Sequence, residues 1–425
     1  MKNQSNKLQN KGHVAIFQCY WSVQVHTLNI VDLLLAAEWK VDLYLYNTGS
    51  RIGDLTELSK TRDHLTLHQL DGSAVMPVFA DKWSLKGLLQ RAEWHVKKAF
   101  YASDTSNVSY AVVEKTKSSF EQRHYHGMLA IEPLSMVWAS RVRGRKNTPL
   151  VYYSLEVYTA QDGRMPEDAY TRQNKAEAVC FKKIDGLIIQ DSARADILNE
   201  KYGVTNPPTS VYLPVSLKPY AKKEDVSYFL HDRLGLSHQT NIVLYLGILT
   251  SNRFCEDLID VADSLPESYQ LVIHTGSAPQ TEYEHEVHEV ALSKGIPVST
   301  ESLPIEQVPE LFASSSIAVV LYTPDTPNNR LTGRASEKAA MAAQTGTPII
   351  AMSSTSLGDV IEEYHNGVAI DDLKQFPAAV RAIDQDYVRY TKGSIKAYDE
   401  IYNFDAHQGK LVAFLDKVFC SRKYN

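Results

Sequence analysis

Short apolar runs alternate with amphipathic stretches along most of this chain, and that alternation limits the possible folds more than any other feature. Residues 13–19 form an apolar run that predicts a buried strand, residues 27–39 have the spacing of a helix, and residues 41–46 predict a second strand. A strand, a helix and a strand this close together make a βαβ unit, which builds a parallel sheet.

The alternation occurs in two successive blocks. In the first block, further strands are predicted at 127–131, 150–153, 186–190 and 211–214, with helices at 134–142, 168–184 and after Asp191. From residue 217 to about 236 the pattern weakens and charges increase, which predicts a linker. In the second block, strands are predicted at 241–247, 270–274, 317–322 and 348–351, with helices at 257–265, 305–313 and 336–344. The sequence thus predicts an α/β protein of two Rossmann-like, doubly wound domains, 1–216 and 217–404, that face each other across a ligand-binding cleft.

The composition excludes several classes of protein. The net charge of −6 and pI near 6.2 do not fit a nucleic-acid-binding domain, so we expect no nucleic-acid partner. The four cysteines are far apart in sequence, which predicts neither a metal-type pair nor a disulfide framework and fits a reducing cytoplasm. The N-terminus is polar and no run of about 18 apolar residues occurs, so we expect no secretory signal, no transmembrane helix and a cytoplasmic location.

Several motifs follow one another in a recognisable order. VLYLGILTSNRFCEDLI (243–259) has a strand, a glycine loop, a basic residue and a helix; LPIEQVPELFASSSI (303–317) is similar to LPxxELPxLYxxAD; and SEKAAMAAQTGTPIIA (336–351) is similar to SxKLxEYMAxGxPVIA. In the first block, VYYSLE (151–156) is similar to vYDxHE, and residues 185–192 and 201–204 match the same branch. With these motifs the chain resembles retaining GT-B glycosyltransferases, in particular glycosyltransferase family 4.

The resemblance implies a nucleotide-sugar donor held mainly by the second domain, without a metal. Arg253 follows the glycine loop and Lys338 lies in the first turn of a predicted helix, so both are candidates to contact the diphosphate, whose charge grows as the glycosidic bond breaks. Gly247 and Gly276 end predicted strands and would allow close approach of the backbone to the donor. Solvated surface charges and ordinary turn glycines are the alternatives. No cofactor is expected, and a UDP-sugar or GDP-sugar is the expected substrate.

One departure from the family pattern concerns two glutamates that the family often carries eight positions apart. Alignment on the glycine and proline after the helix puts Met341 and Gly333 at those positions, and Glu337 is the only nearby carboxylate. The polar loop before the helix contains Thr332, Gly333 and Arg334, whose backbone amides are candidates to contact the donor sugar or phosphate. A solvated surface loop is the alternative.

The first domain is expected to bind the acceptor. The loop after its first strand contains Trp21, Gln24 and His26, which could contact the acceptor or the diphosphate. Glu132 directly follows a predicted strand, and Glu156 stands in the position of the glutamate of the HE pair. A carboxylate there could bind sugar hydroxyls or assist proton transfer, so Glu156, Glu132 and His26 are the catalytic candidates. Structural or surface roles remain open for all three.

A basic, amphipathic stretch at residues 82–100 has apolar residues at helical spacing, five lysines or arginines and two tryptophans. Such a helix can lie on an anionic membrane, which would give a peripheral contact at the inner face and a lipid-linked acceptor. A helix packed on its own sheet is the alternative. The final segment, 405–425, resembles the family's tail, whose last helix packs back on the first domain.

These features lead to one main functional hypothesis and two alternatives. The main hypothesis is a metal-independent, hexosyltransferase-type enzyme that transfers a sugar, with retention, to a carbohydrate or glycolipid acceptor in polysaccharide or glycoconjugate biosynthesis. The alternatives are a non-catalytic GT-B subunit that partners an active glycosyltransferase, which the missing glutamates motivate, and a GT-B sugar-nucleotide epimerase. A dehydrogenase is disfavoured because no GxGxxG follows a predicted strand.

Overall fold

The computed structural model describes residues 11–19, 25–46, 60, 62–70, 110–144, 146–159, 167–220, 227–250 and 253–420. The chain divides into two compact units. The N-terminal unit comprises Met1–Leu213 and Gln408–Asn425, and the C-terminal unit comprises Pro214–His407. No helix in the described part of the chain is long and apolar enough to cross a membrane.

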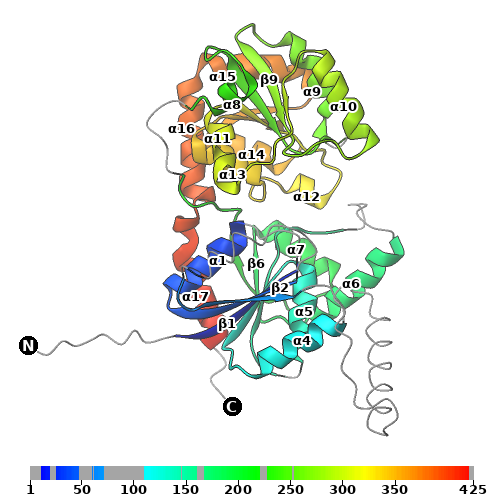
Figure 1. Ribbon diagram of the computed structural model, residues 1–425, viewed down its shortest axis with the longest axis vertical. Helices are drawn as coiled ribbons and strands as arrows, with labels where there is room; N and C mark the ends of the chain where they lie inside the picture. The colour runs from blue at the N-terminus through cyan, green and yellow to red at the C-terminus, as the bar shows by residue number, and fades with distance from the viewer. Residues whose placement is uncertain are drawn as a thin grey trace, which may run out of the picture. The chain divides into compact units, whose positions relative to one another are not determined.

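The N-terminal unit is built on a parallel seven-stranded sheet with the order β3-β2-β1-β4-β5-β6-β7 (Figure 1). Its elements are β1 (Gly12–Cys19), α1 (Val25–Ala36), β2 (Trp39–Tyr46), β3 (Leu65–Leu70), α4 (Tyr110–Glu121), β4 (Gly127–Ile131), α5 (Pro133–Arg143), β5 (Leu150–Tyr153), α6 (Glu167–Phe181), β6 (Gly186–Ile189), α7 (Ser192–Lys201) and β7 (Thr209–Tyr212). The inner strands of this sheet are short apolar runs because helices pack on both faces of a parallel sheet.

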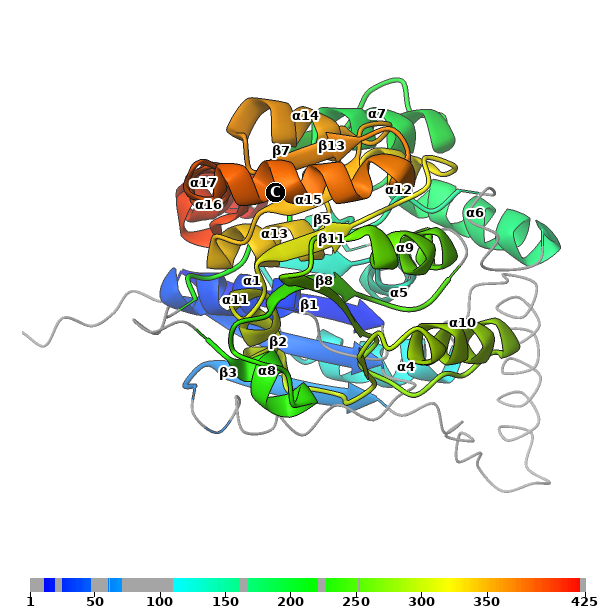
Figure 2. The same ribbon diagram turned by 90° about the horizontal axis from the view of Figure 1, so that it is seen from above.

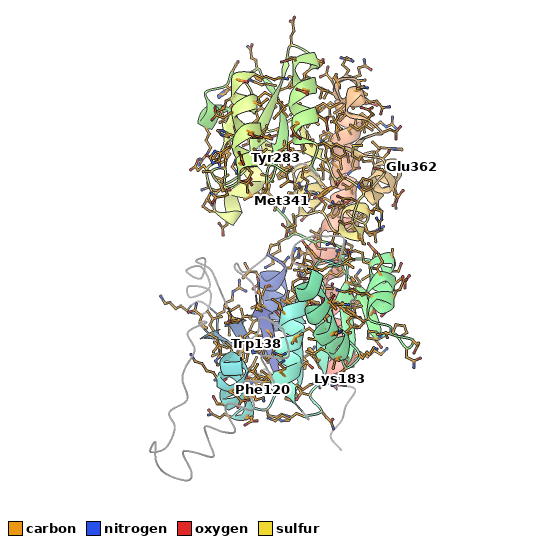
Figure 3. The ribbon with its side chains drawn as sticks, turned by 90° about the vertical axis from the view of Figure 1, so that its right-hand side faces the viewer. Phe120, Trp138, Lys183, Tyr283, Met341 and Glu362 are labelled. Carbon is orange, nitrogen blue, oxygen red and sulfur yellow. The ribbon has the colours of Figure 1, made fainter. Side chains whose placement is uncertain are left out.

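The core of this unit is rich in aromatic side chains. Phe17 of β1 stacks on Tyr44 of β2 and meets the Trp138 ring edge-on, with both ring centres 5.1 Å away. Trp138 of α5 and Phe120 of α4, which Figure 3 labels, are both buried. Trp39 was predicted as the end of a helix but begins β2, because the chain turns at Glu38, whose φ is 66°.

The last helix, α17 (Phe404–Cys420), begins in the C-terminal unit and ends in the N-terminal unit. Phe419 packs edge-on against Trp39, with ring centres 5.8 Å apart. It also lies over Gly127, where a Cβ would be only 2.2 Å from the Phe419 ring. Only glycine fits there, so the end of α17 is packed tightly on β4 and β2.

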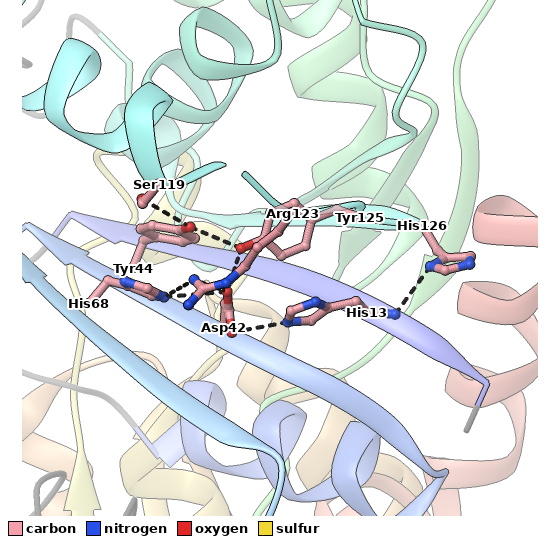
Figure 4. Close-up of polar contacts among 8 residues, drawn as sticks. All are labelled: His13, Asp42, Tyr44, His68, Ser119, Arg123, Tyr125 and His126. Carbon is pink, nitrogen blue, oxygen red and sulfur yellow. Dashed lines mark hydrogen bonds and ion pairs between the residues drawn. The ribbon is translucent and has the colours of Figure 1, made fainter. Parts of the chain in front are cut away.

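A buried polar network lies within the N-terminal unit around Asp42 of β2 (Figure 4). Its carboxylate accepts a hydrogen bond from Tyr125, contacts Arg123 Nη1 at 2.6 Å and lies 3.0 Å from His13 Nε2 and 3.3 Å from His68 Nε2. Burial alone would raise the pKa of Asp42, but the hydrogen bonds with His13, His68 and Tyr125 outweigh it and hold the pKa far below its usual range. The network therefore joins β1, β2, β3 and the segment before β4.

The C-terminal unit is built on a parallel six-stranded sheet with the order β10-β9-β8-β11-β12-β13. Its elements are α8 (Phe229–Leu234), β8 (Asn241–Leu246), α9 (Cys255–Val261), β9 (Tyr269–His274), α10 (Glu282–Ser293), β10 (Val298–Ser299), α11 (Val308–Ala313), β11 (Ile317–Val320), α12 (Pro327–Arg330), α13 (Glu337–Thr345), β12 (Ile349–Met352), α14 (Ser356–Tyr364), β13 (Gly367–Ile370), α15 (Phe376–Gln385) and α16 (Tyr387–Ala397). Figure 2 shows β8 and β11 side by side in this sheet.

The start of the C-terminal unit differs from the predicted plain linker. Leu217 pairs with Asn403 through a backbone bridge, and residues 229–234 form α8, whose end is capped by Gly235 in the left-handed conformation. Charged residues hid the apolar positions of this short helix, of which Leu230 is buried. The predicted helix at 336–344 is α13, where Ser336 caps the N-terminus by accepting a hydrogen bond from the Ala339 amide.

Candidate functional site

In the C-terminal unit, the predicted donor residues gather at one edge of the sheet. Gly247 directly follows β8, Gly276 follows β9, and Tyr322 lies two residues beyond β11. The carboxyl ends of neighbouring parallel strands meet at the same edge, where ligands of open α/β sheets bind.

Arg253 and Lys338 converge there on the ring of Tyr322. The Arg253 Cζ lies 4.0 Å and the Lys338 Nζ 4.9 Å from the ring centre. Within the described residues neither cation has a carboxylate partner, and Arg253 Nη1 is buried without a hydrogen-bond acceptor. We call Arg253 and Lys338 the cation pair. Two positive groups without a counter-ion form a site for an anion.

The electrostatics of Tyr322 and Lys338 reflect this unbalanced charge. Burial and the neighbouring Arg253 lower the pKa of Lys338, with Tyr322 opposing them. Burial would raise the pKa of Tyr322, but the charges of Lys338 and Arg253 and a hydrogen bond with Ser336 outweigh it, so this pKa lies below its ordinary value. The tyrosine ring thus contacts two like charges at once.

The two glycines at this edge adopt backbone conformations that favour glycine. Gly247 has a φ of +145°, and a Cβ there would lie 3.3 Å from Lys338 Nζ. Gly276 has a φ of +69°, and a Cβ there would lie 3.7 Å from His274 Nε2. The absence of a side chain at Gly247 therefore leaves room for the lysine ammonium beside the turn.

The loop before α13 uses its polar groups inside the protein. The Gly333 amide donates to Ser356 Oγ at 2.7 Å, and a Cβ on Gly333 would lie 2.3 Å from the Ser356 carbonyl oxygen. The Thr332 hydroxyl donates to a backbone carbonyl, and the carbonyl of Arg334 accepts a backbone amide. Glu337 is exposed in the first turn of α13. In this structure Gly333 is thus a packing position with its amide satisfied.

In the N-terminal unit, the two candidate glutamates lie together at the carboxyl edge of the sheet. Glu132 follows β4 and is buried, and its Oε1 accepts hydrogen bonds from the amides of Leu155 at 2.7 Å and Glu156 at 3.2 Å. Its Oε2 accepts a hydrogen bond from the Tyr158 hydroxyl at 2.9 Å. Three hydrogen bonds therefore fix the turn after β5 to the Glu132 carboxyl group.

Glu132 has two features that are common at functional sites. Its φ of 71° is unusual for a residue other than glycine. Burial, with the charge of Glu156, raises its pKa to about 7, although three hydrogen bonds oppose the shift. A carboxyl group with this pKa can hold or release a proton near neutral pH.

His26, the third catalytic candidate, lies near the start of α1 and is buried. Its ring meets Tyr153, the last residue of β5, edge-on with ring centres 6.4 Å apart. Trp21 and Gln24 lie outside the described residues, as does the stretch 82–100. Contact with Tyr153 places His26 beside the strand that leads to Glu156.

Sequence analysis missed the two tyrosines that organise these sites. The Tyr322 ring makes cation–π contacts with both members of the cation pair, and the Tyr158 hydroxyl donates a hydrogen bond to Glu132. The available signal was position, because Tyr322 ends the strand predicted at 317–322 and Tyr158 comes five residues after the strand predicted at 150–153. The cysteines are free, with Cys420 exposed and the other three buried.

Comparison with known proteins identifies the fold. A scan against protein-family models and a search of curated proteins found no match. Among solved structures, the chain is similar to a sucrose-phosphate synthase from Thermosynechococcus elongatus, with a TM-score of 0.68 at 15% identity over 97% of this chain and 100% of the other. Anabaena HepE in complex with UDP-glucose gives 0.68 at 13% identity over 96% and 100%. WaaG, a glycosyltransferase involved in lipopolysaccharide biosynthesis, gives 0.60 at 13% identity over 96% and 99%. The chain has the α/β GT-B fold.

Proposed function

We propose that this protein is a GT-B glycosyltransferase of the family 4 type that transfers a hexose from a nucleotide-diphosphate sugar to a carbohydrate or glycolipid acceptor. The observation that carries this proposal is the cation pair at the carboxyl edge of the C-terminal sheet, which has no carboxylate partner in the part of the chain that the structure describes. A diphosphate supplies the charge that this site lacks. The HepE structures with UDP and with UDP-glucose favour a UDP-sugar as the donor.

In the proposed reaction the diphosphate is the leaving group. As the glycosidic bond breaks, negative charge grows on the diphosphate, and Arg253 and Lys338 stabilise it more strongly than in the ground state. The N-terminus of α13 lies beside Lys338 and adds the positive end of a helix dipole. We therefore propose a reaction in which these cations stabilise the charge without a metal ion.

The N-terminal unit supplies the acceptor side. Glu132, with its pKa near 7, takes part in proton transfer from the acceptor hydroxyl or binds it, and Glu156 and His26 position the acceptor. We propose retention by attack on the same face as the departing diphosphate, with no protein nucleophile. We also propose that the reaction serves polysaccharide or glycoconjugate assembly in the cytoplasm, with residues 82–100 as a peripheral membrane contact.

One alternative enzyme has a specific observation in its favour. A UDP-N-acetylglucosamine 2-epimerase from Listeria monocytogenes, itself described as putative, has a similar structure, with a TM-score of 0.57 at 11% identity over 97% of each chain. An epimerase uses no acceptor and forms no glycosylated product. A transferase releases free nucleotide in proportion to the acceptor that it glycosylates. This difference separates the two functions.

The first experiment measures the melting temperature of the protein with UDP, GDP, ADP, CMP and the corresponding sugars. A ligand that binds only the folded state raises the free energy of unfolding, by about 2.7 kcal/mol at 100 times its Kd, and the melting temperature rises with it. We expect one nucleotide to do so, and Arg253→Ala to remove the effect. Nucleotide release that depends on added acceptor then establishes transfer. If no nucleotide at about 10 mM shifts the melting temperature, the donor site is wrong and a non-catalytic subunit is favoured.

A further inference from the structure

A cavity lies in the C-terminal unit, at the amino edge of its sheet. It has a volume of about 420 Å³, within the range of small-molecule sites. Asn241, which begins β8, lines it, as do Ser316 just before β11 and Thr347 just before β12. The cation pair lies beyond the opposite ends of these strands. The six residues of β8 span about 20 Å at about 3.3 Å per residue, so this cavity is separate from the candidate donor site.

The lining of this cavity combines aromatic rings with hydroxyl groups. Eight of its lining residues are serine or threonine and three are tyrosine. Tyr228 and Tyr387 are 36% and 37% exposed. His238 stacks on one face of the Tyr228 ring with ring centres 4.0 Å apart, so a ligand can reach only the other face of that ring. The described residues that line it include no lysine or arginine, and its one carboxylate, Glu310, already accepts a hydrogen bond from Ser227 at 3.0 Å.

His231 presents an unused hydrogen-bond acceptor in this lining. Its side chain is only 5% exposed, and its Nε2 lies 2.8 Å from the carbonyl oxygen of Thr240. A carbonyl only accepts, so Nε2 carries the hydrogen and, in the neutral ring, Nδ1 is an acceptor. Nδ1 is buried and has no hydrogen-bond partner among the described residues. A buried acceptor without a donor is costly. Nδ1 is closed off from solvent as the ring stands, so a ligand hydroxyl satisfies it only if the His231 ring turns toward the cavity.

The charge around the cavity disfavours an anion. The last turn of α13 ends at Thr345 and α11 ends at Ala313, and both of these residues line the cavity. Carbonyl groups at the ends of helices carry partial negative charge, and Glu310 adds to it. Phosphates are therefore unfavourable here, whereas hydroxyl groups can donate to these acceptors.

We propose that this cavity is a second binding site that takes a neutral carbohydrate. Tyrosine rings cover the apolar face of a sugar, and His231 Nδ1 accepts from one sugar hydroxyl once its ring turns. The serine and threonine oxygens accept from other sugar hydroxyls, because six of these eight hydroxyls already donate within the protein. The proposal does not depend on the glycosyltransferase function, because it rests on a different edge of the sheet. A free sugar and the end of a glycan chain share this chemistry.

The test uses ligand-observed saturation-transfer NMR on the full chain with glucose, maltose and maltohexaose, and with inorganic phosphate as an anionic probe. His231→Gln keeps a donor to the Thr240 carbonyl and removes the Nδ1 acceptor, so we expect about tenfold weaker binding. Tyr228→Ala removes a partly exposed ring, and we again expect about tenfold weaker binding. Tyr212→Ala, at a 45% exposed tyrosine of the N-terminal unit, is the matched control and should bind as the parent does.

Two further variants separate this site from the proposed donor and acceptor sites. Sugar binding that survives Lys338→Ala and Glu132→Gln but is lost in His231→Gln and Tyr228→Ala supports the proposal, even if no nucleotide binds the protein. Preference for maltohexaose over glucose identifies a glycan end as the ligand, and equal binding identifies a free sugar. Binding lost in Glu132→Gln but kept in Tyr228→Ala overturns the proposal, as does binding of phosphate alone or of none of the sugars.

Discussion

Replacing Lys338 by methionine should make the ligand-free protein more stable while abolishing nucleotide binding. Methionine keeps an unbranched side chain beside Tyr322 but removes the charge. Both cations lie over one ring, so the two distances to its centre place their charges no more than about 9 Å apart. At that separation and an effective dielectric constant of about 20, their repulsion is about 2 kcal/mol.

The net gain is smaller than the repulsion because the lysine also interacts favourably with the ring. A cation–π contact contributes about 0.5–1 kcal/mol, so Lys338→Met should stabilise the ligand-free protein by about 1 kcal/mol. The lowered pKa of Lys338 has the same sign, since the folded state disfavours the charged lysine. For a unit the size of Pro214–His407, this corresponds to a rise in melting temperature of about 2–4 °C.

Differential scanning fluorimetry with and without UDP measures both effects. The matched control is Lys294→Met, which removes a surface lysine paired with Asp260 at 2.9 Å and should change the melting temperature little. A ligand-free Lys338→Met that melts below the parent, with the UDP-induced shift intact, would refute the assignment of an uncompensated anion site.

Three other substitutions have expected outcomes. The raised pKa of Glu132 means that the folded state holds the proton more tightly, so the parent protein should lose about 3 kcal/mol of stability as the pH rises from about 4.5 to about 7. Glu132→Gln should abolish this loss, and urea titrations at pH values across this range measure it. Asp42→Asn should destabilise the protein by about 2–3 kcal/mol at neutral pH. The difference should shrink as pH falls below about 4, since the lowered pKa of Asp42 stabilises only the ionised form; equal instability at both pH values would contradict this. Gly333→Ala should cost about 1–3 kcal/mol by clashing with Ser356 yet leave nucleotide affinity per folded molecule unchanged in a direct titration, and a selective loss of affinity would instead make Gly333 a donor contact.

Sequence pattern was sufficient for the strands that lie in the middle of each sheet. Strands such as β1 and β8 are buried on both faces, so they are continuous apolar runs and their ends were predicted within a residue or two. The edge strands β3 and β10 were missed for the same physical reason, whereas the edge strand β7 was partly predicted by the run at 211–214. In β3 only the first and last residues are buried, and β10 has only two residues, so neither produces an apolar run.

The candidate donor site was predictable in its parts but not in its arrangement. The motif order made Arg253 and Lys338 candidates for the same diphosphate, although 84 residues separate them in sequence. Their shared contact is a third residue, Tyr322, which no motif distinguished. The packing role of Gly333 was also hidden, because the Ser356 backbone, which no motif marks, leaves no space for a side chain there.

The two units hold opposite electrostatic imbalances, and a sugar transfer needs both. In the C-terminal unit, burial and a neighbouring cation weaken the hold of Lys338 on its proton, so an anion is needed to stabilise its charge. In the N-terminal unit, burial and a neighbouring carboxylate strengthen the hold of Glu132 on its proton. A departing diphosphate supplies negative charge to the first site, and an acceptor hydroxyl that loses its proton needs a base such as the second. Neither imbalance improves the packing of its own unit, so their occurrence at the carboxyl edges of both sheets is better explained by substrate chemistry than by stability.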